Sequence, residues 1–563
     1  TGTYAVAYGA GTSWKIGVFT GGTPCTNGVF GDPIVGTAKQ CFIATSPSTP
    51  PTTTAGSLTT DGFFYTRVKV CEANSSGVLQ DTRKYNGEDF CLKYPSGKFK
   101  PAGNLQKYSD RLRVSAFGYL MDDSLDRYGG VLRAPMKYVG PKTYDINGSL
   151  VTGTNPKIEW NETTGVFVAN PEGASEGKSG VVNYLNQFGR TGSTPGNYKT
   201  YDPVGELYYE ALRYIQGLDP TPQATNGINA TMKDGFPVYD KGSSGQTLAW
   251  TDPHAGGSNT KDYSCLKNNI VVVGDVNTHA DKSVPGNTLT SSNDFTRTAN
   301  LANNEPDFRD WTKVVGRFEQ KGNKTYLDGT TAAGVSRNTN ASNTNTANSN
   351  SIYTDLQDAT PGCCNNNSYL MAGIAYWANT HDVRGTNWTA NTAAQRPGMR
   401  VTTYVLDVNE YGNQTNLTTR RNNQFYLAAK YGGFKDQSGG KGNPFLNASG
   451  VTDNSGWETS PGSNLASKYF LSSSAADVLK SLRDIFENIA QEGNSIAGGA
   501  ISTQRLTSVG GYIYQAQFDA ADWSGDLVSY PVSVSSSNVV TIADGTTVPA
   551  QWSAGAKLNA KIA

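Results

Sequence analysis

The residues with the clearest potential for chemistry lie in one short polar stretch, Asp275-x-Asn277-x-His279-x-Asp281. Their alternating spacing could wrap side-chain ligands around a hard divalent cation such as calcium or magnesium. The stretch lacks the central Gly and the distal Glu of an EF-hand loop. Asp and Asn also hydrogen-bond turns that follow strands. The sequence therefore allows two interpretations, a cation site or a purely structural turn.

The element that would position this stretch is the apolar run at residues 270–273, IVVV. An unbroken β-branched run predicts a strand buried on both faces of a helix-flanked parallel sheet. Gly274 ends the run, and Asp275 follows it. Ligands of open α/β sheets bind beyond the carboxyl ends of the strands. We therefore expect Asp275 to lie at a candidate site.

Catalytic motifs are missing from the sequence. It has three histidines and contains no HExxH, no G-x-S-x-G and no phosphate-binding G-x-x-x-x-G-K-[ST]. Asp252 and His254 would form a metal-hydrolase cluster with Asp275 and His279 only if folding brought the four together. The sequence predicts a protein that is not an enzyme, with no certain cofactor.

The charge balance and composition favour an exported protein. Lys+Arg and Asp+Glu are equal at 47 each, so no basic field indicates binding to nucleic acid or to an anionic membrane. The charged fraction is only 17%, with 63 Gly and 30 Tyr, which is typical of secreted surface proteins. No run approaches the ~20 apolar residues of a membrane helix. Because the chain begins at Thr1, we expect a processed product whose export signal has been removed.

The cysteines predict disulfides rather than a metal or redox motif, since none forms Cys-x-x-Cys. The seven are Cys25, Cys41, Cys71, Cys91, Cys265, Cys363 and Cys364. Local spacing predicts the pairs Cys25–Cys41 and Cys71–Cys91, each stabilising the fold by about 3 kcal/mol. Cys265 would then pair with Cys363 or Cys364 and leave one over. The alternative is seven reduced cysteines in a cytosolic protein.

The order of predicted elements indicates a doubly wound α/β domain over residues 1–495. Asp202-Pro203 predicts a helix start with Asp202 as N-cap, and Ser474-x-x-Asp477 predicts another. Further elements are expected as strands at 400–408 and 468–471 and as helices at 370–379, 423–431 and 474–491. Residues 329–368 form an Asn/Thr/Ser-rich insertion loop. Short alternating strands at 512–518, 527–534 and 539–542 indicate a separate all-β domain over 496–563.

Several segments together resemble the PilC/PilY family, large proteins at the tips of bacterial type IV pili. They are Gly129-Gly130-Val131-Leu132-Arg133-Ala134, YDPVGELYYEALRY at 201–214, GDVNTHADK at 274–282, AGIAYWANTHDVR at 372–384 and DWSGDL at 522–527. The resemblance implies a domain similar to von Willebrand factor A domains, followed by the first strands of a C-terminal β-propeller. By this resemblance, Asp275 corresponds to the last Asp of the cation site that von Willebrand factor A domains usually carry. The usual D-x-S-x-S loop is not found, and Asp122-x-Ser124, which follows a later predicted strand, is a poor substitute for it.

The resemblance also implies a function. A family member would be an extracellular pilus-tip adhesin and assembly factor that supports twitching motility. Its propeller would bind minor pilins at the filament tip, and its N-terminal domain would face host cells or abiotic surfaces. The alternative is a secreted carbohydrate- or matrix-binding protein that is not associated with pili.

Overall fold

A parallel sheet organises the larger of two units in the computed structural model, which divides the chain into Thr1–Lys69 and Val70–Ala563. The structure describes residues 3–11, 13–43, 70–80, 84–85, 88–122, 128–146, 148–187, 201–241, 250–276, 278–279, 281, 283–284, 306, 308–319, 368–385, 392–410, 412, 414–416, 420, 423–492, 499–501, 511–518, 525–534, 540–542 and 552–562. The predicted insertion loop at 329–368 lies outside these residues except for Ser368.

The parallel sheet contains β10 (Asn268–Gly274), β11 (Val401–Asp407) and β12 (Tyr469–Leu471), in that order. Asn268 pairs with Val401 at one end of β10 and Gly274 with Asp407 at the other. Val405 of β11 pairs with Tyr469 of β12. The strands predicted at 270–273, 400–408 and 468–471 are therefore confirmed, and they are parallel.

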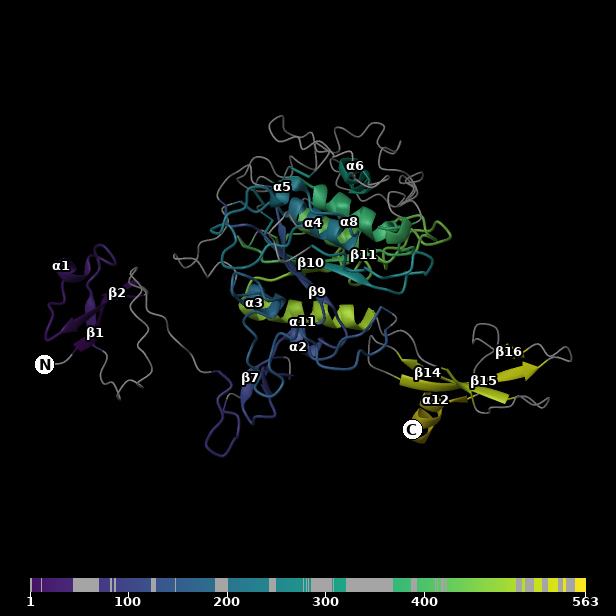
Figure 1. Ribbon diagram of the computed structural model, residues 1–563, viewed down its shortest axis with the longest axis horizontal. Coiled ribbons are helices and arrows are strands. Elements are labelled where there is room, and N and C mark those ends of the chain that lie inside the picture. Colours follow the sequence, from purple (N-terminus) through teal and green to yellow (C-terminus); the bar gives the residue numbers. More distant parts are fainter. Residues whose placement is uncertain are drawn as a thin grey trace. The chain divides into compact units, whose positions relative to one another are not determined.

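Helices cover both faces of this sheet (Figure 1). On β11, Val401 and Val405 face a large core shared with helices α4 (Val204–Ile215), α8 (Leu370–Thr380) and α10 (Gln424–Gly433). Tyr404 and Leu406 face the other side and pack against Ile485 of α11 (Ala475–Glu492). The two-residue period of a strand explains this division. The fold is mixed α/β, as predicted.

One detail of the prediction is wrong, because β10 is not buried on both faces. The buried strand is β11, and Val273 of β10 is 56% exposed. The helix α11 packs on β11 and β12, which leaves the end of β10 uncovered. A run of valines indicates a strand, but it does not show whether a helix covers that strand's last residue.

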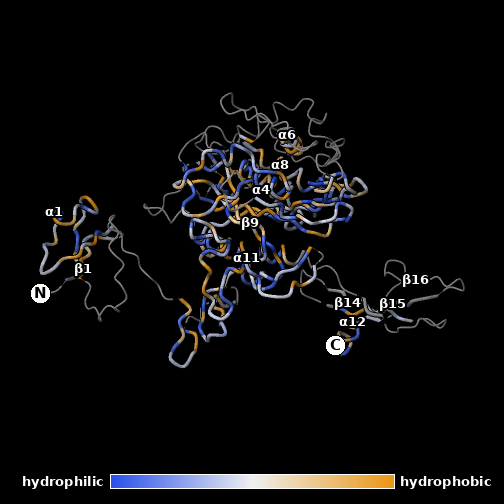
Figure 2. The backbone as a smooth tube through the Cα atoms, in the orientation of Figure 1, coloured by the Kyte–Doolittle hydropathy of each residue, from blue (hydrophilic) through white to orange (hydrophobic). Residues whose placement is uncertain are grey.

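The core between the helices is apolar and aromatic, and Figure 2 shows hydrophobic segments gathered around α4, α8 and β9 (Val131–Lys137). Helix α8 is buried almost all round, because α4, α6 (Phe308–Glu319) and α10 pack against it. Gly373 permits the contact with α6, since a Cβ there would lie 2.2 Å from Thr312 Oγ1.

A buried ion pair lies inside this core. Lys430 of α10 is fully buried and contacts Glu319 of α6, which also accepts a 2.7 Å hydrogen bond from the Tyr431 hydroxyl. The Lys430 ammonium lies 4.3 Å from the ring centroid of Trp457 and 4.9 Å from that of Phe445. The charge is thus compensated by one carboxylate and by aromatic rings.

The part of the larger unit that precedes α4 is built from small pieces. They are β4 (Lys84–Tyr85), β5 (Glu88–Asp89), β6 (Cys91–Lys93), β7 (Phe99–Pro101), α2 (Asn104–Lys107), β8 (Val114–Gly118), which pairs antiparallel with β9, and α3 (Val181–Gln187). Two short elements, α5 (Pro222–Thr225) and the 3₁₀ turn η2 (Thr392–Ala394), follow later in the chain. The predicted Cys71–Cys91 disulfide is confirmed.

The smaller unit is a three-stranded antiparallel sheet with the order β2 (Ser13–Thr20), β1 (Thr3–Ala10), β3 (Gln40–Ile43). Tyr8 stacks on Phe30 of the short helix α1 (Asn27–Phe30), and the predicted Cys25–Cys41 disulfide closes the unit. Cys265 is exposed and is bonded to no described cysteine, and its predicted partners lie outside the described residues.

The C-terminal segment forms its own antiparallel sheet. Its strands are β13 (Gly499–Ile501), β14 (Gly511–Phe518), β15 (Gly525–Val534), β16 (Val540–Ile542) and β17 (Trp552–Ser553), followed by α12 (Ala554–Ile562). The strands predicted at 512–518, 527–534 and 539–542 are confirmed as β14, β15 and β16. The segment is not all-β as predicted, because the helix α12 follows β17. The predicted boundary at 495/496 falls among residues outside the description and stays a prediction.

Candidate functional site

Two polar clusters occupy the carboxyl edge of the parallel sheet, where β10 and β11 end. The first surrounds Asp407, the last residue of β11, which is fully buried. Its carboxylate accepts hydrogen bonds from Asn409 N (2.8 Å), Asn423 Nδ2 (2.9 Å) and the Tyr469 hydroxyl (2.7 Å). Asn423 is also the N-cap of α10. Asp407 therefore joins β11, β12 and α10, which is a structural role.

The Asp407 cluster also perturbs a neighbouring tyrosine. Burial, reinforced by the adjacent Asp407 carboxylate, raises the pKa of Tyr469 above its ordinary value. The Tyr469 hydroxyl therefore remains a hydrogen-bond donor to Asp407 at any physiological pH.

The second cluster surrounds the first turn of α4. Asp281 is fully buried, and its carboxylate accepts from Gly205 N (2.8 Å) and from Gln424 Nε2 (3.1 Å). Gln424 Nε2 also donates to Thr278 Oγ1 at 2.9 Å. Gly205 is required here, since a Cβ at that position would lie 2.7 Å from Asp281 Oδ1. The Asp281 carboxylate, from a segment distant in sequence, thus accepts a hydrogen bond at the N-terminal turn of α4, where backbone N–H groups have no acceptor within the helix.

The helix start differs from the prediction. Helix α4 begins at Val204 with Pro203 as its N-cap residue and with no side-chain cap. Asp202 instead accepts from His279 N at 2.9 Å, and its Oδ1 lies 2.7 Å from His279 Nδ1. Asp281, rather than Asp202, accepts a hydrogen bond from the first turn of α4, and no local sequence pattern could have indicated this contact.

Glu206 completes the cluster and is almost fully buried. Its carboxylate accepts from Ser283 N at 2.8 Å and from Gly129 N. Gly129 precedes β9, and a Cβ there would lie 2.5 Å from Glu206 Cβ, so the Gly129-Gly130 pair permits the approach of α4. Tyr119, just beyond β8, lies within electrostatic reach of Asp202, Asp281, Glu206 and Asp275.

The electrostatics of this cluster are unusual for carboxyl groups. Burial raises the pKa of Asp281 to about 7, although the hydrogen bonds from Gln424 and Gly205 oppose the shift. Burial likewise raises the pKa of Asp202 to about 6, with Asp275 adding to the shift and His279 opposing it. A bound proton or a nearby cation stabilises such buried carboxyl groups by removing or compensating their negative charge.

The structure places three of the four predicted cation ligands, and they do not share one arrangement. Asp281 and His279 make the contacts described above, Asp275 follows β10 at the edge of the sheet, and Asn277 lies outside the described residues. Within the described part of the chain, no group of three or more His, Cys, Asp or Glu side chains is arranged to hold a metal ion. The cation site stays a prediction.

The possible hydrolase cluster is not assembled. His254 bonds Asn268, the first residue of β10, with Nε2 and Oδ1 3.0 Å apart, whereas Asp275 and His279 follow the other end of that strand. A seven-residue strand spans about 20 Å. Asp252 forms a two-pronged pair with Arg384, with contacts of 2.6 and 2.9 Å. Burial, reinforced by nearby arginines, lowers the pKa of His254 to about 3, so the ring is neutral.

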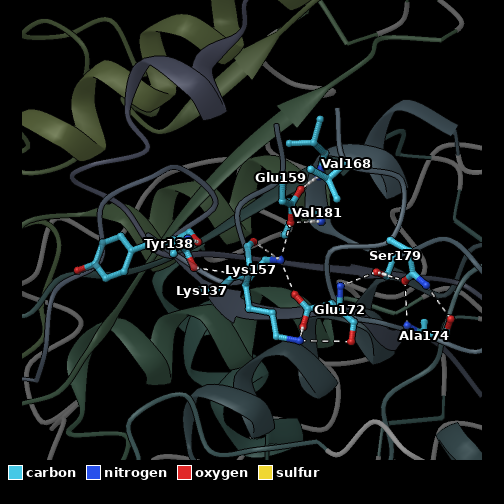
Figure 3. Close-up of polar contacts among 12 residues, drawn as sticks. Lys137, Tyr138, Lys157, Glu159, Val168, Glu172, Ala174, Ser179 and Val181 are labelled. Carbon is cyan, nitrogen blue, oxygen red and sulfur yellow. Dashed lines mark hydrogen bonds and ion pairs between the residues drawn. The ribbon is translucent and has the colours of Figure 1, made fainter. Parts of the chain in front are cut away.

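A third polar network, which no sequence motif indicated, holds the loops after β9 in place (Figure 3). The buried Glu159 accepts from Val181 N (2.8 Å) and Val182 N (2.7 Å) at the start of α3, and Lys137 Nζ lies 2.9 Å from it. Lys137 and Lys157 both contact Glu172. Every charge in this network has a partner, so its role is structural.

Comparisons with known proteins agree with one another. Residues 124–378 match a family model described as the second domain of PilY1 homologs. The chain is 33% identical over 487 residues to the type IV pilus biogenesis factor PilY1 homolog of Xylella fastidiosa, an alignment that covers 83% of this chain and 35% of the relative. The chain thus spans about a third of that relative's length. No solved structure matches the chain at a significant level.

Proposed function

Because the chain belongs to the PilY1 family, we propose that it is the surface-exposed part of a type IV pilus adhesin and assembly factor. The similarity to the Xylella pilus biogenesis factor carries this proposal. In it, the α/β unit is a von Willebrand factor A-like domain, and β13–β17 are the first strands of a propeller. The propeller binds minor pilins at the filament tip, and the α/β unit faces host cells or abiotic surfaces.

The two disulfides are the feature of the chain that supports an extracellular location. The Cys25–Cys41 and Cys71–Cys91 disulfides persist in oxidising compartments. No helix in the described part of the chain is long and apolar enough to cross a membrane. Both disulfides lie near the amino end, where they would hold small sheets together under tension during pilus retraction.

The protein acts by binding rather than by catalysis in this proposal. His254 contacts Asn268 at the start of β10, whereas His279 follows the other end of that strand and contacts Asp202. The buried carboxylates around α4 are held by backbone and amide donors. A divalent cation at Asp275 and its neighbours would act by neutralising these carboxyl groups and stabilising the edge of the sheet.

Electron microscopy of sheared native filaments, labelled with an antibody raised against residues 1–490, tests the proposal. Label confined to one end of each filament is the expected result. Label spread over the cell surface, or recovered only from the medium, would contradict a tip location and favour a secreted matrix-binding protein. A strain that lacks the protein should lose piliation or twitching, and unchanged piliation, adhesion and twitching would contradict both roles.

A further inference from the structure

The C-terminal sheet carries a groove of about 360 Å³ lined by Tyr512, Tyr514, Ser529 and Trp552. Its volume lies at the small end of the range for ligand pockets. Tyr512 is 42% exposed and Trp552 37% exposed, whereas Ser529 is buried. The groove therefore has exposed aromatic walls and a small polar floor.

Strand pairing explains how this groove is built. Tyr514 of β14 pairs with Ser529 of β15, and Ser529 pairs with Trp552 of β17. Residues paired directly across strands project from the same face, so the three form one row. Two strand spacings place the Tyr514 and Trp552 backbones about 10 Å apart, with the small Ser529 between them. Tyr512 lies two residues along β14 and extends the same wall.

The position of Trp552 is fixed by an aspartate of β15. Asp526 accepts hydrogen bonds from Gly555 N (2.7 Å) and from the Ser553 hydroxyl, and Ser553 Oγ accepts from Ala556 N (3.0 Å). These bonds hold the junction of β17 and α12, immediately after Trp552. A side chain of the DWSGDL segment thereby positions one wall of the groove.

The chemistry of the lining selects a class of ligand. None of the four residues carries a charge at neutral pH, so the groove offers nothing to compensate an ionic group. It offers ring faces together with three hydroxyls and one indole N–H. A ligand that matches must be neutral, with apolar C–H faces and many hydroxyls around its edge. Sugar rings have this combination.

We propose that this groove binds a neutral carbohydrate, with a sugar ring lying over Ser529 between Tyr514 and Trp552. The Tyr512, Tyr514 and Ser529 hydroxyls and the Trp552 indole N–H are the groups that reach the sugar hydroxyls. This goes beyond a pilus role, because it gives the purified chain a ligand class of its own. A chain that binds sugars but does not associate with pilus filaments would support only the carbohydrate proposal. A chain that associates with filaments but binds no sugar would support only the pilus proposal.

Isothermal titration of the full 563-residue chain with cellobiose, chitobiose and lactose tests the proposal. We expect saturable binding of at least one of these disaccharides. Glucose 6-phosphate should bind more weakly than any disaccharide that binds, because no cation lines the groove. Trp552→Ala and Tyr512→Ala should each lower the affinity about tenfold, which corresponds to about 1.4 kcal/mol.

Two control variants separate ligand contact from misfolding. Trp552→Phe keeps a ring face and should retain affinity to within about threefold. Trp14→Ala removes a tryptophan of similar exposure, 38%, in the smaller unit and should leave binding unchanged. Thermal unfolding of each variant checks that it is folded. Binding that is unaffected by the Trp552 and Tyr512 variants, no saturable binding of any disaccharide, or saturable binding of a proline-rich peptide in place of sugars would each overturn the proposal.

Discussion

The carboxyl edge of the parallel sheet and the groove of the C-terminal sheet use polar groups in opposite ways. At the edge, Asp281, Glu206 and Asp407 are buried, and each accepts hydrogen bonds from two or more described groups. In the groove, the exposed rings of Tyr512 and Trp552 and the buried Ser529 line a space with no charged side chain. Buried acids that are satisfied internally hold a fold together, whereas exposed aromatic rings present a surface on which a ligand can pack.

The largest expected effect belongs to the buried side of this comparison. Lys430→Met leaves Glu319 buried without its cation and should lower the free energy of unfolding by about 3–5 kcal/mol. The double variant with Glu319→Leu should recover most of that loss, because both charges are then removed. Urea unfolding measures both. A single variant that costs less than about 1 kcal/mol would show that the pair contributes little.

A smaller loss is expected at the carboxyl edge. Asp281→Ala removes the acceptor of the Gly205 N–H and one of the two acceptors of the Gln424 amide, and it should cost about 2–4 kcal/mol. Asp453→Ala is the matched control, because Asp453 is only half-buried and bonds Ser455 within its own turn. The control should change stability by less than about 1 kcal/mol. Equal losses in the two variants would contradict the importance of burial.

The pH dependence of stability should reveal the neutral His254. The pKa of His254 is about 3 in the folded chain and about 6.5 in the unfolded chain. Between pH 3 and pH 6.5, the unfolded chain therefore binds a proton that the folded chain does not. Stability therefore falls on acidification below about pH 6.5, by up to about 1.4 kcal/mol per pH unit. His254→Gln should remove this contribution. Urea unfolding from pH 7 to pH 4 measures the slope, and identical slopes in wild type and variant would refute the assignment.

The smallest effect on stability is expected in the groove. Tyr512→Ala removes a side chain that is 42% exposed and should lower the free energy of unfolding by less than about 1 kcal/mol. The same substitution should lower the sugar affinity about tenfold, as expected above. Thermal unfolding checks the first quantity, and a loss of several kcal/mol would show that Tyr512 belongs to the core rather than to a binding surface.

The strands, helices and two disulfides could be predicted because their signals are local. The valine run at 270–273, the Ser474-x-x-Asp477 cap and the spacing of Cys25 and Cys41 each depend on neighbours in sequence. The rule that selected Asp275, an acid after a buried strand, would also have selected Asp407 at the end of the strand predicted at 400–408.

Other features depend on contacts between distant segments. Asp281 caps α4 across 76 residues, and Lys430 meets Glu319 across 111. No local pattern encodes either contact. The exposure of Val273 has the same origin, because it depends on where α11 packs. The groove was missed for another reason: Tyr514, Ser529 and Trp552 meet only through strand pairing, and single aromatic residues in short strands are ordinary core residues.

The pairing of β10 with β11 has a consequence for how the chain reaches its native state. Asn268 pairs in parallel with Val401, so a long segment must be closed into a loop before these strands can pair. Contacts of such high sequence separation slow folding, because the entropy of loop closure is lost before the contact forms. The β1–β2 and β8–β9 hairpins have no such delay. We expect refolding in at least two phases, with hairpin formation preceding the assembly of the parallel sheet.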